Sequence, residues 1–349
     1  MPSGVDNAAE ADYSGVLHKI EGIVIKWTHQ VKSVLELKSG QALIDGKNPG
    51  PQEELKFWSD LSSNLHCIYE QLSEPKVRKM AQILHEKDSS YFTSLLNMYD
   101  DVRMHLEEAR DISMHLKPIR NLLDDIEQTD MGEIEPKLNA LYHLVALIWA
   151  SSEYYRSPAR VVVLLQEVGN FIIEITRTYL DPENILKGEL DEAYDQVKTA
   201  AKVLSDFKRL YFEYCEKLPR YFKEGQQVVL WEFRPVLIFH RFDRFAQRVD
   251  LIADFFRSSI EMMNLEKVEI GGIRGHSLSS QVVVLFEEFQ ELHKTMSDAE
   301  IDALDPEDHQ FDDLYEMFRN RLYDMDRRLG SILCQAFDDC TSVEHMFKA

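Results

Sequence analysis

Apolar residues recur three and four positions apart along most of the chain, which is the period of one face of an α-helix. One long stripe contains Leu190, Tyr194, Val197, Ala201, Leu204, Phe207, Tyr211, Tyr214, Leu218 and Phe222. A second stripe, close to a heptad repeat, contains Phe311, Leu314, Phe318, Leu322, Met325, Leu329 and Ile332. Similar spacing predicts further helices at about 14–38, 51–72, 89–127, 133–155, 159–180, 235–264 and 279–296.

The joints between these helices are short and polar, with breaks at 46–50, 223–225 and 271–275. Glycine and proline are scarce, at 14 and 11 of 349 residues, which disfavours a turn-rich all-β fold. The alternation in Lys267–Ile270 predicts either one short strand or an extended connector. The sequence therefore predicts an all-α fold, an elongated series of antiparallel helical bundles with at most one short strand.

The length exceeds the roughly 250–300 residues that a single hydrophobic core supports. Residues 1–15 are small and acidic and predict a flexible N-terminal tail. Residues 16–349 form the predicted bundle region, which allows two lobes with joints near 223–232 and 265–278.

The chain is strongly acidic, because 39 basic and 61 acidic side chains give a net charge of −22. Nucleic acid and anionic membrane surfaces are therefore disfavoured as partners. Met1–Tyr13 lacks the features of a signal peptide, and the apolar run Leu138–Ala150 is too short to span a bilayer, so we expect a soluble intracellular protein. The four cysteines form no CxxC motif and are expected to be reduced thiols. They are Cys67, Cys215, Cys334 and Cys340.

The segment Gly40–Lys47 is the nearest approach to a phosphate-binding loop. Such a loop needs four residues between its glycines and a Ser or Thr directly after the Lys. Here five residues separate Gly40 from Gly46, and Asn48 follows Lys47. We therefore predict a polar turn between helices, without binding or hydrolysis of ATP.

The segment Asp298–Asp313 carries eight carboxylates and raises the question of calcium binding. An EF-hand loop that began at Asp298 would need Gly at its sixth position and Glu at its twelfth. Those positions hold Ala303 and His309, so we predict a solvated acidic linker.

His66 and Cys67 are adjacent, and no second pair lies at a metal-ligand spacing. We predict one histidine carried on a helix and one small buried thiol. The sequence contains neither HExxH nor G-x-S-x-G. It therefore predicts no catalytic residue, no cofactor-binding residue and no metal-binding residue.

Residues Phe239–Arg248 interleave cations with aromatic side chains. Phe242 and Phe245 are three apart, so they share one helical face and are expected to point into a core. The arginines of the neighbouring face are Arg241, Arg244 and Arg248. Such a pattern can bind single-stranded nucleic acid, but the net charge favours two other readings. The arginines either pair with the carboxylates of 298–313 or anchor another protein.

Six unbroken segments resemble the dynein heavy-chain family, in the first tail (stem) region that precedes the motor. They are Ile20–Val31 (IEGIVIKWTHQV), Glu54–Leu72 (ELKFWSDLSSNLHCIYEQL), Pro75–Leu84 (PKVRKMAQIL), Leu144–Ile173 (LVALIWASSEYYRSPARVVVLLQEVGNFII), Lys267–Gln281 (KVEIGGIRGHSLSSQ) and Asp324–Asp339 (DMDRRLGSILCQAFDD). The similarity runs from about residue 16 to the end, in the family's order. The residues of these segments are more similar to those of axonemal dyneins, especially outer-arm beta-type chains, than to those of the cytoplasmic form.

The resemblance implies a non-catalytic tail segment. In this family the ATPase ring of AAA modules and the microtubule-binding stalk lie far downstream, so ATP and Mg belong to the motor and no cofactor is implied here. The chain stops at His345–Ala349 directly after an amphipathic run, which is expected of a tail fragment or a truncated gene model.

The resemblance also implies partners and a location. The partners are dynein intermediate and light chains, other dynein heavy chains and, indirectly, the doublet microtubule. The location is the cytoplasm and cytoskeleton, in the axoneme of a cilium or flagellum. Long helices in series agree with this role, because they offer broad side surfaces without a pocket. The alternative is a stand-alone α-helical adaptor or tether unrelated to a motor, and the missing motifs argue against an enzyme.

Overall fold

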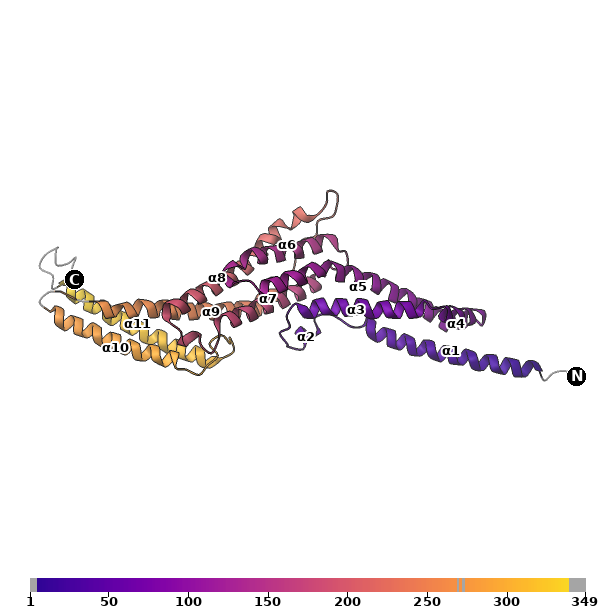
Figure 1. Ribbon diagram of the computed structural model, residues 1–349, viewed down its shortest axis with the longest axis horizontal. Helices are drawn as coiled ribbons and strands as arrows, with labels where there is room; N and C mark the ends of the chain where they lie inside the picture. The colour runs from indigo at the N-terminus through magenta and orange to yellow at the C-terminus, as the bar shows by residue number, and fades with distance from the viewer. Residues whose placement is uncertain (1–4, 269, 272–273, 339–349) are drawn as a thin grey trace. The chain divides into compact units, whose positions relative to one another are not determined.

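The computed structural model describes residues 5–268, 270–271 and 274–338, and helix is the only regular secondary structure in these ranges (Figure 1). Within them the eleven α-helices are α1 (Val5–Leu35), α2 (Gln41–Ile44), α3 (Gln52–Leu72), α4 (Pro75–Glu86), α5 (Tyr91–Glu127), α6 (Glu135–Ser151), α7 (Pro158–Leu180), α8 (Leu190–Lys217), α9 (Val236–Met263), α10 (Gly275–Ser297) and α11 (His309–Asp338). Four 3₁₀ turns are η1 (Met131–Glu133), η2 (Ile185–Lys187), η3 (Leu218–Tyr221) and η4 (Asn264–Lys267). The predicted all-α fold is confirmed.

Most helices begin and end close to their predicted bounds, and the differences have local causes. Helix α1 begins at Val5 and so extends into residues 1–15, for which the sequence predicted a flexible tail. Helices α2 and α4 were not predicted. Helix α4 places Val77 and Leu84 in the core, and Met80 and Ala81 pack against it, so the sequence carried a helical pattern at 77, 80, 81 and 84 that was overlooked, with Pro75 in the first turn as a start signal.

The segment before α10 contains Lys267–Ile270, for which the sequence predicted either a short strand or an extended connector. Lys267 ends η4, and Val268 is extended with φ −85° and ψ 116°. Glu269 lies outside the described residues, as do Cys340 and the segment 345–349. The described residues of this segment, Lys267, Val268 and Ile270, form no strand.

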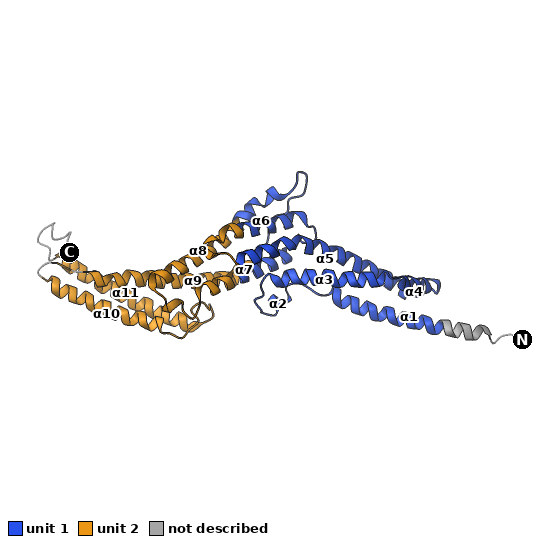
Figure 2. Ribbon diagram, in the orientation of Figure 1, with its two compact units in different colours: residues 1–127, 139–171, 213–237 blue, residues 128–138, 172–212, 238–349 orange. Residues whose placement is uncertain are grey.

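The chain forms two compact units (Figure 2). Unit 1 contains residues 1–127, 139–171 and 213–237, and unit 2 contains residues 128–138, 172–212 and 238–349. The divisions fall inside α6, α7, α8 and α9 or at the end of α5. The joints predicted near 223–232 and 265–278 each lie within a single unit. None of the helices in the described ranges has the length and apolar character needed to span a bilayer.

The core of unit 1 at its N-terminal end is shared by α1, the α3–α4 pair and α5. Its buried members are Ile20, Val24, Val31, Leu72, Val77, Leu84, Leu95, Met98 and Val102. Each fully buried side chain of this size stabilises the fold by roughly 1.5–3 kcal/mol relative to its exposed state. Packing against α5 therefore holds α1 in place.

The core of unit 2 is built from aromatic rings. Phe207 of α8 packs on Phe242 of α9 with ring centroids 5.1 Å apart. Farther along α9, Phe255 meets Phe318 of α11 edge-on at 5.0 Å and stacks on His293 of α10 at 5.4 Å. Helices α9, α10 and α11 therefore share one bundle core, in which edge-to-face contacts add to the burial of apolar area.

Candidate functional site

The aromatic face of α9 lies in the core, as the sequence predicted. Phe242 and Phe245 are each 2% exposed. They are three residues apart on a helix, so their side chains project toward the same neighbours. These two rings are part of the scaffold of unit 2.

Two arginines of α9 pair with the acidic segment of the same unit. Arg244 donates from Nη1 to Oε1 of Glu307 at 2.8 Å. Arg248 donates from Nη2 to Oδ1 of Asp312 at 2.7 Å, and its guanidinium lies 4.3 Å from the ring centroid of Phe311. The sequence left internal pairing and a protein anchor open, and for these two arginines the structure shows internal pairing.

Burial separates the two arginines. The Arg248 side chain is only 4% exposed, and its burial lowers the pKa of the guanidinium while Asp312 acts in the opposite direction. An arginine stays protonated at neutral pH even so. Arg244 and Glu307 are both largely in solvent. Arg248 therefore belongs to the packed interior, whereas Arg244 makes a surface ion pair.

The acidic segment links α10 to α11, and its carboxylates are exposed or half-buried, as the predicted solvated linker requires, but its backbone is also fixed by local hydrogen bonds. Three of its aspartates each accept a hydrogen bond from a backbone amide two residues later, at 2.8–3.0 Å. The acceptors are Asp302, Asp305 and Asp308, and the backbone amides that donate to them belong to Leu304, Glu307 and Gln310 respectively. Ala303 and Leu304 are fully buried. Asx turns and two buried apolar residues fix the loop, while the arginines of α9 neutralise part of its charge.

The segment Gly40–Lys47 forms the short helix α2 and its flanking turns. Gly40 adopts φ +78°, and a Cβ at this position would lie 2.9 Å from Cγ2 of Val163. Gly46 also has a positive φ, of +75°. The left-handed backbone accounts for both glycines without a phosphate ligand, and the close approach of Val163 is a second reason for Gly40.

His66 is held by neighbours on α3 and α5. Its Nδ1 lies 2.7 Å from Nη2 of Arg110, and its Nε2 lies 3.3 Å from Oε1 of Glu70. Cys67 is exposed, so the prediction of a buried thiol was wrong. No group of three or more potential metal ligands occurs among the residues that the structure describes.

A buried carboxyl pair in unit 1 escaped the sequence reasoning. Glu54, in the first turn of α3, and Glu167, on α7, are each 1% exposed. The backbone amide of Glu54 donates to Oε2 of Glu167 at 3.0 Å. Oε1 of Glu54 accepts from Nε1 of Trp58 at 2.7 Å and from the hydroxyl of Tyr155 at 3.1 Å. The sequence signal was Glu167 inside an apolar run, which reads equally well as a solvent-facing position.

Burial governs the protonation of this pair. It raises the pKa of Glu167 to about 8, with the nearby charge of Glu54 as the second cause. Burial also raises the pKa of Glu54, although the donors Trp58 and Tyr155 act against it. Two carboxylates this close in a desolvated site cannot both be ionised cheaply. The pair therefore stores a proton and fixes the start of α3 against α7.

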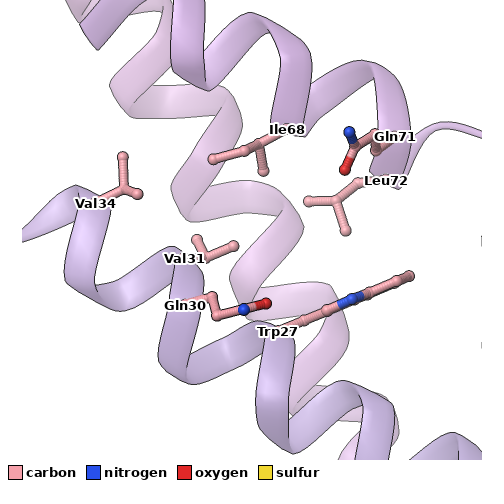
Figure 3. A pocket seen from close by; sticks show the side chains of 7 residues that line it. All are labelled: Trp27, Gln30, Val31, Val34, Ile68, Gln71 and Leu72. Carbon is pink, nitrogen blue, oxygen red and sulfur yellow. The ribbon is translucent and has the colours of Figure 1, made fainter.

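An apolar groove opens between α1 and α3 in unit 1, with a volume of ≈ 160 Å³. Figure 3 shows the residues that line it, which are Trp27, Gln30, Val31 and Val34 of α1 and Ile68, Gln71 and Leu72 of α3. The lining is mainly hydrophobic, with two carboxamides at the rim. Such a surface is suited to contact with another helix.

Comparison with known proteins gives consistent matches along nearly the whole chain. Residues 17–349 match the family described as "Dynein heavy chain, N-terminal region 1". "Dynein beta chain, ciliary" of Heliocidaris crassispina is 44% identical over 333 residues, which are 95% of this chain and 8% of that protein.

Two further relatives extend the comparison. "Dynein axonemal heavy chain 17" of Homo sapiens is 42% identical over 351 residues, covering 100% of this chain and 8% of that protein. "Dynein beta chain, flagellar outer arm" of Chlamydomonas reinhardtii is 32% identical over 334 residues, which are 95% of this chain and 7% of that protein. The chain thus spans 7–8% of the length of these relatives.

Proposed function

This chain belongs to the dynein heavy chain family, and we propose that it is a non-catalytic tail segment that assembles and anchors an axonemal dynein. The observation that carries the proposal is the match of residues 17–349 to the N-terminal region of the family. That match argues against the alternative of a stand-alone helical adaptor unrelated to a motor. Relatives named for cilia, axonemes and flagella support the axoneme as the location.

The packing of the chain supports a mechanical role. Long helices share continuous cores in both units, so load on one helix is borne by its neighbours. The charged groups that sequence reasoning considered for chemistry, Arg248 and the aspartates of 302–312, hold loops and helices together. The proposal therefore assigns ATP hydrolysis, with its ATP and Mg, to the part of a heavy chain outside the matched residues.

The proposed partners are dynein intermediate and light chains and other dynein heavy chains, with the doublet microtubule contacted indirectly. The net charge of −22 supports basic partner surfaces and argues against direct binding to nucleic acid or an anionic membrane.

Co-purification tests the proposal. The tagged chain is co-expressed with axonemal intermediate and light chains and with the N-terminal region of a second heavy chain, and the purified complex is measured by native mass spectrometry. A helical protein of matched size and net charge serves as the control for nonspecific attraction. We expect a defined complex with at least one of these subunits that the control does not form. Recovery of the chain alone would overturn the proposed function.

A further inference from the structure

Helix α1 carries a second apolar stripe beside the one that it buries. Ile20, Val24 and Val31 are in the core of unit 1. Val16 and Ile23 are 42% and 40% exposed. Val16, Ile23, Trp27 and Val34 follow one another at spacings of seven, four and seven residues, so the four share one face. This second stripe leads along α1 into the groove.

The groove has two helical walls and no cover among the described residues. Trp27 and Val34 lie on one wall, and Ile68 of α3 lies on the other (Figure 3). Both walls belong to helices that pack on α5. Two helices resting on a third leave a channel into which the ridge of another helix can pack. An occupant with residues at i, i+3, i+4 and i+7 would match this shape.

The charge at the edge of the stripe is opposite to that of the chain as a whole. Lys19 and Lys26 are exposed and are seven residues apart, so they share a face that borders Ile23. Neither forms an ion pair with another residue in the described ranges. In a chain with a net charge of −22, this unpaired positive edge favours an acidic occupant.

We propose that the α1–α3 groove binds an amphipathic helix of a partner subunit, with apolar residues in the groove and acidic residues beside Lys19 and Lys26. The inference rests on the proposed function, since it names the kind of helix that an assembling tail would receive. A second copy of α1 is a poor occupant. It would bring its own Lys19 and Lys26 toward the same edge, and like charges disfavour that pairing.

Titration calorimetry with the full chain and two designed peptides tests the proposal. Both peptides are amphipathic helices of about 24 residues, well above the ~12–15 below which isolated helices are marginal. Each has Leu at heptad positions a and d. One has Glu at e and g, and the other has Lys there. We expect the Glu peptide to bind at least about tenfold more tightly than the Lys peptide at low salt, with the preference shrinking as salt rises.

Matched variants locate the site. Ile23→Asp should weaken binding of the Glu peptide about tenfold or more, because it places a charge in the apolar stripe. Ile25→Asp is the control, since Ile25 is equally exposed at 41% but lies on the opposite side of α1. Lys19→Glu with Lys26→Glu should abolish the preference for the Glu peptide, whereas Lys32→Glu, 70% exposed and on another face, should leave it unchanged.

Circular dichroism confirms that the variants remain folded. Equal binding of the two peptides, or equal effects of Ile23→Asp and Ile25→Asp, would overturn the proposal. A dimer of the chain that dissociates in Ile23→Asp would also overturn it, by showing that a second copy occupies the groove. The peptide assay tests binding in the groove and nothing else. If the peptides do not bind but the chain still co-purifies with dynein subunits, the groove proposal fails and the proposed function stands.

Discussion

The backbone amide of Glu54 donates a hydrogen bond to the side chain of Glu167 at 3.0 Å, which joins the first turn of α3 to α7 through a buried carboxyl group. The positive end of the α3 dipole favours one negative charge at this point. The second carboxyl must then hold a proton, because burial and the first charge both oppose its ionisation. The pair links the stability of unit 1 to pH.

The first prediction is that this link destabilises the protein as pH rises. The folded pKa of Glu167 is about 8, well above its value of 4.5 in an unfolded chain. Between these values the folded state binds more protons, so the free energy of unfolding falls as pH rises from about 4.5 to about 8. The expected change is on the order of a few kcal/mol, at about 1.4 kcal/mol per pKa unit. Urea melts across this range measure it.

Glu167→Gln isolates this contribution. The amide keeps an oxygen acceptor for the Glu54 amide and cannot ionise, so the difference between variant and parent should grow with pH in favour of the variant. Glu107→Gln is the control, because Glu107 is exposed on α5 and is not among the groups that shift the pKa of Glu167. A difference that stays constant from pH 5 to pH 9 would show that Glu167 is ionised in the folded protein.

The second prediction concerns His293, which titrates in the opposite sense. It stacks on Phe255 in the core of unit 2, and burial lowers its pKa from 6.5. Between the lowered pKa of the folded state and the ordinary value of 6.5, the folded state therefore binds fewer protons than the unfolded state. The stability of unit 2 should rise as pH increases across this range. NMR titration of the His293 ring should give a midpoint below 6.5. A midpoint at or above the ordinary value would contradict the packing.

The third prediction is a core test on α9. Phe242→Ala and Phe245→Ala should each destabilise the protein by about 3–5 kcal/mol, because each removes a buried ring and leaves a cavity. Phe337→Ala is the control, since its side chain is 49% exposed and surface substitutions usually stay within about 0.5 kcal/mol. Chemical denaturation compares the three variants, and similar losses in all of them would show that the α9 face is not buried.

The fourth prediction separates the two paired arginines. Arg248→Ala should cost about 1–3 kcal/mol, because it removes a buried cation from Asp312 and from the face of Phe311. Arg244→Ala should cost about 0–1 kcal/mol, since both members of its ion pair are in solvent. Thermal melts distinguish the two. A greater loss of stability in Arg244→Ala than in Arg248→Ala would show that Arg248 is not the more buried of the two arginines.

The sequence predicted what depends on local periodicity and missed what depends on distant partners. The repeat of apolar residues located the long helices, and the spacing of Phe242 and Phe245 placed both in the core. The partners of Arg248 lie 60 and 64 residues away, so no local pattern could choose between pairing and a free anchor.

The same limit explains the carboxyl pair. Glu54 and Glu167 are 113 residues apart, and each alone reads as an ordinary polar position on an amphipathic helix. The buried position of Glu167 becomes visible only when α3 is packed on α7. The burial of Ala303 and Leu304 within the acidic linker was missed for a similar reason, since these two residues reach a core only in the folded chain.

The most direct test of the account is deletion of residues 17–349 from a full-length heavy chain that contains them. The purified motor is then compared with the intact chain for basal ATPase activity and, by sedimentation, for incorporation into a complex with intermediate chains and other heavy chains. The account predicts that ATPase activity is retained while incorporation is lost. Normal incorporation of the deleted chain, or loss of ATPase activity from a folded motor, would contradict it.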